Sequence, residues 1–410
     1  MRGTVEAGSL ADQYARPGYG IENLPYASFC TADGIPRLGV RIGDKVLDIA
    51  AVVANDGRAT AKLLSAVDGP NLDKLLAAGR NVWDELRALL TRQLGSAQAS
   101  VGLHTFDVEA ISLFMPFTVA DYVDFYASEF HAANVGQMFR PGQEPLTPNW
   151  KHLPIGYHGR AGTIVPSGTD FPRPKGLRPG PDGNPTFGPT RKLDIEAEVG
   201  FVVGGAAPDG EVPLDEVGDH LFGVVLVNDW SARDIQAFEY VPLGPFLGKS
   251  FATSISLWVV PMAALTAARI SPPARENALA PYLDDQGGEA WALDISLEIS
   301  LADEVISRPT YASMYWTPAQ MLAHMTVNGA GQRPGDFFSS GTVSGPARQQ
   351  RGSFLELSWN GTEPLTLKSG RKLTFLEDKD EVVIRGTAPG PGGTTINIGE
   401  VAGRILPPTV

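Results

Sequence analysis

The sequence predicts a mainly β protein that is divided into two domains. Short alternating or apolar runs recur along most of its 410 residues, and helical periodicity is confined to a few segments. A chain of this length usually needs more than one hydrophobic core. The residue pattern changes near position 115, where a small β-rich unit with added helices ends and a larger, β-dominated unit begins.

The N-terminal unit is expected to contain an arm, a hairpin and a helix. Residues 1–20 are small, polar and glycine-containing, which indicates a loose arm. Residues 36–49 alternate between apolar and polar and predict two strands joined by a two-residue turn at Gly43-Asp44. Four apolar residues at helical spacing predict a helix: Val82, Leu86, Leu89 and Leu90.

The C-terminal unit begins with residues that favour loops and continues with strands. Residues 141–192 are rich in glycine and proline, and so long a stretch is typical of functional or mobile loops. A helix is expected from Thr317-Pro318, a capping residue followed by proline at the first helical position. Alternation or apolar runs predict strands at residues 193–203, 221–227, 291–301, 353–359 and 382–386.

Composition favours an enzyme of the cytoplasm. The net charge of −13 disfavours nucleic acid and anionic membrane surfaces as partners. The single cysteine, Cys30, can form neither an intramolecular disulfide nor a thiolate metal cluster, and we expect it to be a small buried apolar residue. Residues 1–14 contain no apolar stretch of signal-peptide length, and no run is long enough to span a bilayer.

Acidic residues in the segment 193–199 are candidate metal ligands. Strict alternation places Asp194, Glu196 and Glu198 on one face of a strand. Carboxylates at this spacing, roughly 6.5–7 Å apart, can converge on one cation and would repel each other without it. The similar pattern at 293–299 needs no metal, so a solvated strand face explains the spacing equally well.

A second candidate group follows the apolar run 221–227. Asp229 lies at the rim of this predicted buried strand, where it is either a site acid or a capping residue. The next segment, 231–240, predicts a short helix on which Arg233, Gln236 and Tyr240 share a face. Such a face offers donors to carboxylate or enolate oxygens, or is simply solvated.

The histidines belong to no recognised hydrolase motif. Neither H-E-x-x-H nor G-x-S-x-G occurs, and the loop 244–250 lacks the spacing of a phosphate-binding loop. We expect Asp124 and His131, seven residues apart, to lie on similar faces of one helix. A histidine beside a metal-binding acid could activate water, although a single histidine is more often structural.

Together these segments resemble the fumarylacetoacetase family. The motifs that carry the resemblance are DYVDFY at 121–126, HAANVG at 131–136, PIGYHGR at 154–160, NDWSARDIQ at 228–236 and EYVPLGPFLGKS at 239–250. The resemblance runs from about Gly20 to the C-terminus, and the segment ending in GKS at 248–250 is specific to this family within its superfamily. One departure is Ala252, where we expect glycine, which puts the backbone near Thr253 in question.

The resemblance implies a fold and an activity. It implies an arm over residues 1–20, an SH3-like domain over 21–115 and a catalytic β-roll of the fumarylacetoacetase type over 116–410, in a homodimer. The implied reaction is hydrolysis of a β-diketo acid, fumarylacetoacetate, to fumarate and acetoacetate, the last step of tyrosine and phenylalanine degradation. It uses Ca²⁺ or Mg²⁺ and no organic cofactor. A superfamily relative that decarboxylates, hydrates or isomerises a 2-oxo acid is the alternative, and a structural Ca²⁺-binding module leaves the histidine and arginines unexplained.

The resemblance also implies roles for individual residues. Asp194 is not in the family's ligand set. His131 would be the general base and Glu356 its orienting partner, while Arg233, Gln236 and Lys249 would stabilise an oxyanion. The implied ion site comprises Asp124, Glu196, Glu198 and Asp229, with Lys249 and Thr253 nearby. The implied substrate contacts are Tyr126, Arg140, Tyr157, Gln236, Tyr240 and Thr342.

Overall fold

A five-stranded antiparallel sheet with helices on one side forms the N-terminal unit of the computed structural model, which describes residues 14, 16–95, 104–205, 207 and 210–409. The predicted hairpin is confirmed, because Ile42 pairs with Lys45 across the Gly43-Asp44 turn. The predicted helix is also confirmed, as α5 (Arg80–Gly95). Most of the predicted arm lies outside the described residues. The strands are β1 (Tyr26–Cys30), β2 (Arg37–Ile42), β3 (Lys45–Asp48), β4 (Thr105–Asp107) and β5 (Ser112–Phe114), and the other helices are α2 (Ile49–Ala54), α3 (Ala61–Val67) and α4 (Asp73–Ala78).

An eight-stranded sheet forms the centre of the C-terminal unit. Every residue of β13 (Ala197–Val203) and β14 (Leu221–Asp229) is buried, as their apolar sequences predict. These two strands pair in antiparallel register, with Ala197 opposite Asn228. The remaining strands of this sheet are β6 (Asp121–Phe125), β7 (Gly156–His158), β8 (Ile164–Pro166), β16 (Thr253–Ile255), β17 (Val260–Pro261) and β22 (Asp336–Ser339).

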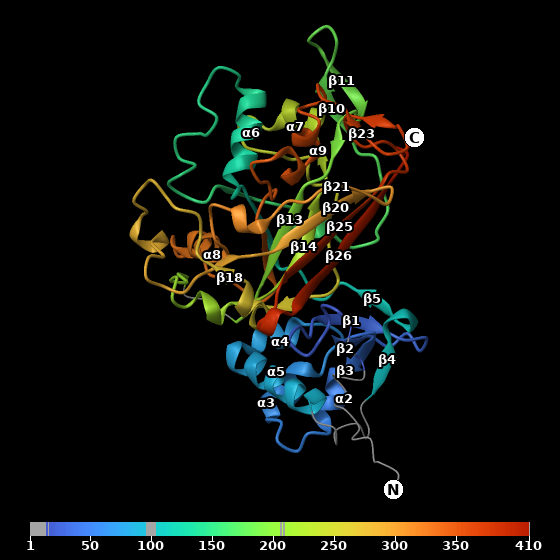
Figure 1. Cartoon of the computed structure of the whole chain (residues 1–410), viewed down its shortest axis with the longest axis vertical. Helices are drawn as coiled ribbons and strands as arrows, with labels where there is room; N and C mark the ends of the chain where they lie inside the picture. Colours follow the sequence, from blue (N-terminus) through green and yellow to red (C-terminus); the bar gives the residue numbers. More distant parts are fainter. Residues whose placement is uncertain (1–13, 15, 96–103, 206, 208–209, 410) are drawn as a thin grey trace.

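A second sheet of five strands packs against the first through β14 and β26 (Thr395–Leu406). Figure 1 shows the long strands of both sheets running side by side through the C-terminal unit. The predicted strand at 382–386 is confirmed within β25 (Glu381–Pro389). The other strands of this sheet are β9 (Phe171–Pro172), β20 (Ser296–Leu301) and β21 (Glu304–Ser307), and paired short strands are β10 (Lys175–Pro179) with β11 (Pro185–Pro189), β12 (Leu193–Asp194) with β15 (Ser231–Ala232), β18 (Arg269–Ile270) with β19 (Ala292–Leu293), and β23 (Leu365–Thr366) with β24 (Lys372–Leu373).

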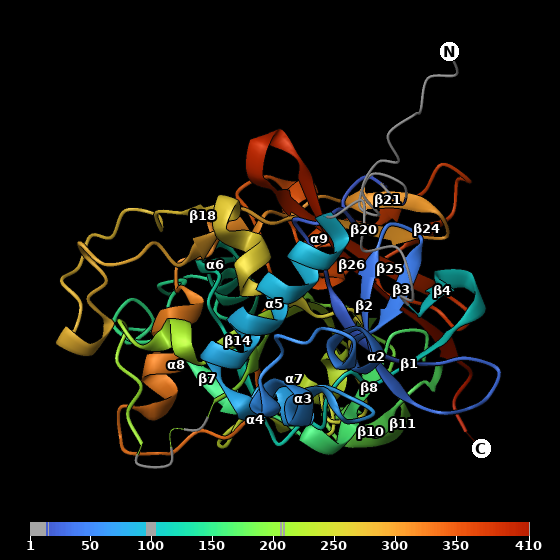
Figure 2. The ribbon, with the colours of Figure 1, turned by 90° about the horizontal axis from the view of Figure 1, so that it is seen from below.

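The two units share a hydrophobic core. The N-terminal helices and sheet lie below the ends of the long C-terminal strands in Figure 1, and in front of the C-terminal unit in the view from below (Figure 2). Leu76 and Leu86 of the N-terminal helices belong to the same buried cluster as Val202, Val225 and Phe337 of the central sheet. The junction is therefore packed like the interior of a single domain.

Helices are few in the described part of the C-terminal unit, as predicted. The helix α8 (Pro318–Thr326) is confirmed and begins with a capping box formed by Thr317 and Gln320. The predicted strand at 353–359 is wrong, because residues 354–357 form the short helix α9 (Phe354–Leu357), which Ser353 caps. The glycine- and proline-rich segment 141–192 also contains several short strands rather than loops alone. The other helices are α6 (Glu129–Phe139) and α7 (Arg233–Glu239). Within the described part of the chain, no helix has the length and apolar character needed to cross a membrane.

Candidate active site

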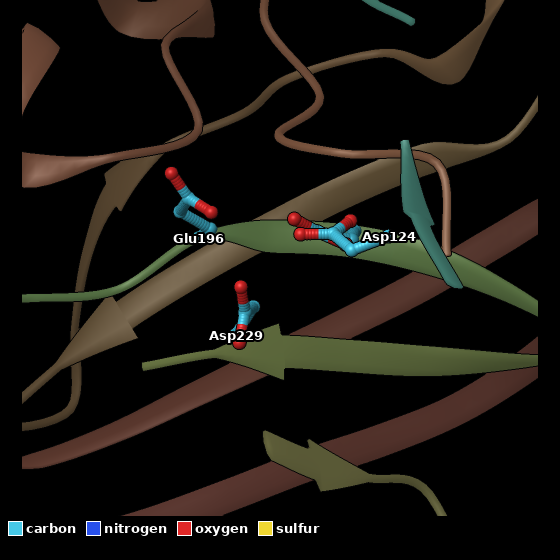
Figure 3. Close-up of side chains that lie close together, drawn as sticks. Asp124, Glu196 and Asp229 are labelled. Carbon is cyan, nitrogen blue, oxygen red and sulfur yellow. The ribbon is translucent and has the colours of Figure 1, made fainter. Parts of the chain in front are cut away.

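Four buried carboxylates converge in the C-terminal unit; we call them the acidic quartet. Asp124 extends from β6, Glu198 from β13 and Asp229 from the end of β14, and Glu196 lies in the gap between β12 and β13. One oxygen of each residue lies within 4.8 Å of the others. In Figure 3 the carboxylates of Asp124, Glu196 and Asp229 surround one space. This spacing is suited to a single divalent cation held by oxygen ligands.

The electrostatics of the quartet fit such a cation. Both carboxylate oxygens of Glu198 are buried and have no hydrogen-bond partner among the described residues. Burial, together with the neighbouring carboxylates, raises the pKa of Asp124 to about 8 and raises the pKa values of Glu198 and Asp229. A buried acid without donors is costly unless it binds a cation or a proton. The quartet is therefore a fitting site for a divalent ion.

Two buried cations flank the quartet. The Lys249 ammonium contacts Glu196 and lies 2.5 Å from Asp229 Oδ2, while the Arg233 Nη2 group donates to Glu196 Oε1 at 2.7 Å. Although burial alone would raise the pKa of Glu196, these two cations hold it below its usual range. Thr253 Oγ1 donates to Asp229 Oδ1 at 3.0 Å. Glu196 is thus ionised and oriented, whereas the raised pKa values of the other three carboxylates favour their protonated forms when no cation is bound.

Asp194 does not join Glu196 and Glu198 in the quartet, and the expected continuous strand is wrong. The ladder is interrupted between Asp194 and Ala197, and the Asp194 carboxylate is not one of the four that converge. Its carboxylate accepts Arg233 Nε at 2.8 Å and the backbone N–H groups of Phe354 and Leu355 at the start of α9. The alternative of a solvated face is also wrong, because all residues from 193 to 199 are buried.

His131 lies between two glutamates. Its Nδ1 is 2.7 Å from Glu356 Oε2, and its Nε2 is 3.7 Å from Glu196 Oε1. Glu356 also accepts bonds from Asn134, Ser344 and Ser353, and although burial opposes ionisation, these groups and His131 lower its pKa. An ionised Glu356 requires the proton of the neutral imidazole to sit on Nδ1, which leaves Nε2 as a base facing the quartet.

The expected common helix for Asp124 and His131 is wrong. Asp124 lies on β6 and His131 on α6, whose first turn is capped by Ser128. The strand and the helix follow each other directly in the chain, so both residues still reach the same site. The seven-residue spacing therefore predicted correctly that the two side chains reach one site, but not the elements that carry them.

The residues implied as substrate contacts surround the site at different depths. The ring of Tyr126 meets that of His131 edge-on, with centroids 5.4 Å apart, and Tyr157 pairs with Asp124 across β6 and β7. Gln236 Oε1 accepts Arg233 Nη1 at 3.2 Å, and the Thr342 hydroxyl is buried without a partner in the described chain. Tyr157, Asp229, Lys249 and Thr253 line a cavity of about 250 Å³ beside the quartet.

Two of the implied contacts lie farther out. Arg140, at the end of α6, is half-buried and donates to the carbonyl of Pro145 at 2.8 Å. Tyr240, just beyond α7, has 46% of its surface exposed. Ala252 is buried without a left-handed backbone, and β16 begins normally at Thr253, so the missing glycine leaves the Thr253–Asp229 bond intact.

Sequence reasoning missed several residues that hold the site together. Ser339 donates to Asp124 Oδ1 at 2.6 Å and is itself 3.0 Å from the Tyr122 hydroxyl. Asn228 Oδ1 accepts the backbone N–H of Glu196 at the strand interruption, at 3.2 Å. Asn134 and Asn228 fall inside the motifs quoted above, so those motifs could have identified them. Ser339 carries no such signal and is found only through the pairing of β22 with β6.

Family models and curated relatives match most of this chain. Two family models match: the fumarylacetoacetase N-terminal model at residues 22–116 and the fumarylacetoacetate hydrolase C-terminal model at residues 122–405. Fumarylacetoacetase from Homo sapiens is 43% identical, with 94% of this chain and 96% of that protein covered. Fumarylacetoacetase from Arabidopsis thaliana is 44% identical, with 97% and 98% covered.

Solved structures share the fold at low identity. A fumarylacetoacetate hydrolase from psychrophilic Exiguobacterium antarcticum has a TM-score of 0.53 at 16% identity, covering 94% of this chain and 99% of that one. A maleylpyruvate hydrolase from a Sphingobium species has a TM-score of 0.51 at 14% identity, covering 94% and 100%. At this identity the likeness concerns the fold alone.

Proposed function

The chain belongs to the fumarylacetoacetase family and is a hydrolase that cleaves fumarylacetoacetate to fumarate and acetoacetate; we propose that His131 and the acidic quartet carry this reaction. The supporting observation is their juxtaposition, with His131 Nε2 facing Glu196 and Glu198 buried without a donor. The difficulty of the reaction is that breaking the bond expels an enolate, whose charge has to be stabilised.

The quartet would hold Ca²⁺ or Mg²⁺. Asp124, Glu196, Glu198 and Asp229 offer the oxygen ligands that these ions prefer. A divalent ion at this place supplies Lewis-acid stabilisation for the charge that develops on the β-diketone oxygens. Lys249 and Thr253 lie beside the ion site and keep Asp229 in place through the bonds that they donate to it.

His131 would supply the nucleophile. Its Nε2 accepts a proton from water, and the Glu356 carboxylate stabilises the resulting imidazolium through Nδ1–H. The hydroxide adds to the carbonyl carbon on the fumaryl side, and the bond from that carbon to the acetoacetyl carbon then breaks. The electron pair leaves with the acetoacetyl carbon, which takes up a proton to give acetoacetate. The only reactant besides the substrate is one water molecule.

Arg233, Gln236 and Lys249 would stabilise the tetrahedral oxyanion. Gln236 Oε1 accepts from Arg233, so its amide nitrogen remains available to donate to substrate. One such donor contributes about 3–4 kcal/mol to a transition state. The carboxylates of the substrate would be bound by Arg140 and by hydroxyl donors: Tyr126, Tyr157, Tyr240 and Thr342. The unpartnered Thr342 hydroxyl supports its part in this set.

We further propose a cytoplasmic homodimer that acts in tyrosine and phenylalanine degradation. The exposed apolar side chains Leu243, 96% exposed, and Val241, 68% exposed, support an interface beyond α7. The single buried Cys30 is consistent with a reducing compartment. We also propose that residues 1–20 form an arm, that the N-terminal domain ends at residue 115 and that the catalytic domain begins at residue 116.

A product assay tests the proposed function. The protein is incubated with fumarylacetoacetate and Mg²⁺ or Ca²⁺, with and without a chelator, and products are separated by chromatography. We expect fumarate and acetoacetate in equal amounts and a loss of both in chelator. Release of CO₂ or an isomerised substrate in place of fumarate would favour the superfamily alternative. Cleavage at the same rate with and without chelator would show that the reaction needs no ion at the quartet.

A further inference from the structure

A second cavity lies far from the quartet, where α5 of the N-terminal unit meets the C-terminal unit; we call it the junction cavity. Its volume is about 280 Å³. It is too small for a drug-sized ligand but large enough for a single ring with one substituent. The N-terminal unit contributes Tyr26, Trp83 and Arg87, and the C-terminal unit contributes Phe222, Arg269 and Trp291.

One wall of the junction cavity is aromatic. The Trp83 ring meets Phe222 edge-on, with centroids 5.1 Å apart, and the Tyr26 ring centroid lies 5.7 Å from that of Phe222. All three side chains are almost fully buried. Because they come from both units and hold each other in place, this wall is preformed for a flat apolar group.

Arg80, Arg269 and Trp291 also line the cavity. The Arg269 guanidinium stacks on the Trp291 ring at 4.1 Å, and its Nε is buried without a hydrogen-bond partner among the described residues. Arg80 donates from Nη1 to the carbonyl of Gly218 at 2.6 Å. A Cβ at Gly218 would lie 3.0 Å from that nitrogen and 3.7 Å from Trp291, so glycine permits this close approach. Burial, with Arg80 nearby, lowers the pKa of Arg269.

The lining contains guanidinium donors that are not all satisfied. Arg80 pairs with Asp84 at 3.1 Å and with Asp219 at 3.9 Å, and Arg269 contacts Glu289. Arg87 donates to the backbone carbonyls of Asn23 and Glu22, and its charge interacts with the Glu22 carboxylate. The acids around the three arginines therefore roughly balance their charge, and Arg269 Nε is the buried donor that lacks an acceptor among the described residues. Such a donor is suited to an oxygen of a bound carboxylate.

We propose that the junction cavity binds a small aromatic carboxylate. The carboxylate group accepts from the arginines beside Trp291, which bind planar anions in a bidentate manner. The ring lies against Trp83 and Phe222. Phe222 is near the start of β14 and Asp229 is at its end, so the junction cavity lies roughly 23 Å from the quartet along one strand. It is thus a site separate from the substrate site.

Calorimetric titration of the full-length protein with benzoate tests this proposal. We expect one benzoate per chain in the wild-type protein, with at least tenfold weaker binding in Arg80→Gln and in Arg269→Gln. Benzyl alcohol, which lacks the charge, and inorganic phosphate, which lacks the ring, should each bind at least tenfold more weakly than benzoate. Arg80 is half-exposed, so Arg80→Gln should keep the wild-type melting temperature and hydrolysis rate even if Arg269→Gln is less stable.

Two matched variants locate the binding. Arg308→Gln replaces an exposed arginine that directly follows β21, and Arg140→Gln replaces an arginine beside the active site. Both variants should bind benzoate as the wild type does. Loss of binding in Arg140→Gln would place benzoate in the substrate site and overturn the proposal. No benzoate binding by the wild type, equal binding by Arg80→Gln, or phosphate binding as tight as benzoate binding would each also overturn it.

Discussion

His131 and Glu356 share a hydrogen bond of 2.7 Å although 225 residues separate them in the chain. The bond directs the other imidazole nitrogen toward Glu196, 3.7 Å away. Glu356 receives further bonds from Asn134, Ser344 and Ser353, so its position is set before any substrate arrives. A base held in one orientation and tautomer is what water activation requires.

Replacing Glu356 with glutamine should mainly lower kcat. The amide keeps the shape of the side chain but cannot stabilise an imidazolium, so we expect kcat to fall by about 10²–10⁴-fold with little change in KM. Steady-state kinetics with fumarylacetoacetate measure the effect. Glu363→Gln, at a half-exposed position on the protein surface, is the matched control and should behave as wild type. A kcat for Glu356→Gln within threefold of wild type would show that His131 does not depend on this carboxylate.

Replacing Glu198 with glutamine should weaken the binding of the ion and stabilise the ion-free protein. The wild-type carboxylate is buried without donors, so removing its charge relieves a penalty in the absence of metal and removes a ligand in its presence. We expect the affinity for Mg²⁺, measured by calorimetry, to fall by at least about tenfold. The melting temperature in chelator should stay level or rise.

Glu298→Gln is the control for that experiment. Glu298 lies in the similar alternating segment 293–299 but pairs with Arg308 at the surface, at 2.9 Å. Its replacement should alter neither metal affinity nor melting temperature. Equal metal affinity in Glu198→Gln and Glu298→Gln would remove Glu198 from the ion site.

Metal affinity should rise with pH up to about 8. Burial and the neighbouring Asp229 raise the pKa of Asp124 in the ion-free protein to about 8, so below that pH the ion has to displace a proton. One displaced proton changes affinity by up to roughly tenfold per pH unit, and the dependence should level off above the pKa. Mg²⁺ titrations in two buffers of different ionisation enthalpy would count the released protons. An affinity that is flat between pH 6 and about 8 would contradict a raised carboxyl pKa at the site.

Replacing Asp194 with asparagine should reduce stability without removing the ion. Its carboxylate pairs with Arg233 and caps α9 through two backbone N–H groups. Breaking a buried pair of this kind costs about 3–5 kcal/mol, which denaturant unfolding would measure. Metal affinity should remain within about threefold, since Asp194 is not one of the four converging carboxylates. A loss of metal affinity as large as that of Glu198→Gln would return Asp194 to the ligand set.

The fold was predictable where one physical signal dominated. The alternation around Gly43-Asp44 and the start signal Thr317-Pro318 each gave the correct element, because local sequence and tertiary structure favour the same conformation there. The segment 353–359 failed because its apolar residues suit either a strand or a buried helix. Asp194, from a distant strand, decides the outcome by binding the N–H groups of Phe354 and Leu355.

The site was predictable only in part. Alternation offered Asp194 as readily as Glu196, because a strand interruption leaves no mark in a period-two pattern. Nothing local links Asp124, Glu198 and Asp229, which meet only through sheet pairing across more than one ladder. Ser339 is the clearest omission, since its role depends on the register that sets it opposite Asp124.

The most direct measurement of the central claim is hydrolysis in water enriched in oxygen-18, followed by mass spectrometry of the products. If His131 delivers water to the carbonyl on the fumaryl side, each fumarate formed carries one heavy oxygen in its new carboxylate, and its formation ceases in His131→Ala. Fumarate without the label, or labelled fumarate formed at a near-normal rate by His131→Ala, would contradict the mechanism proposed for this site.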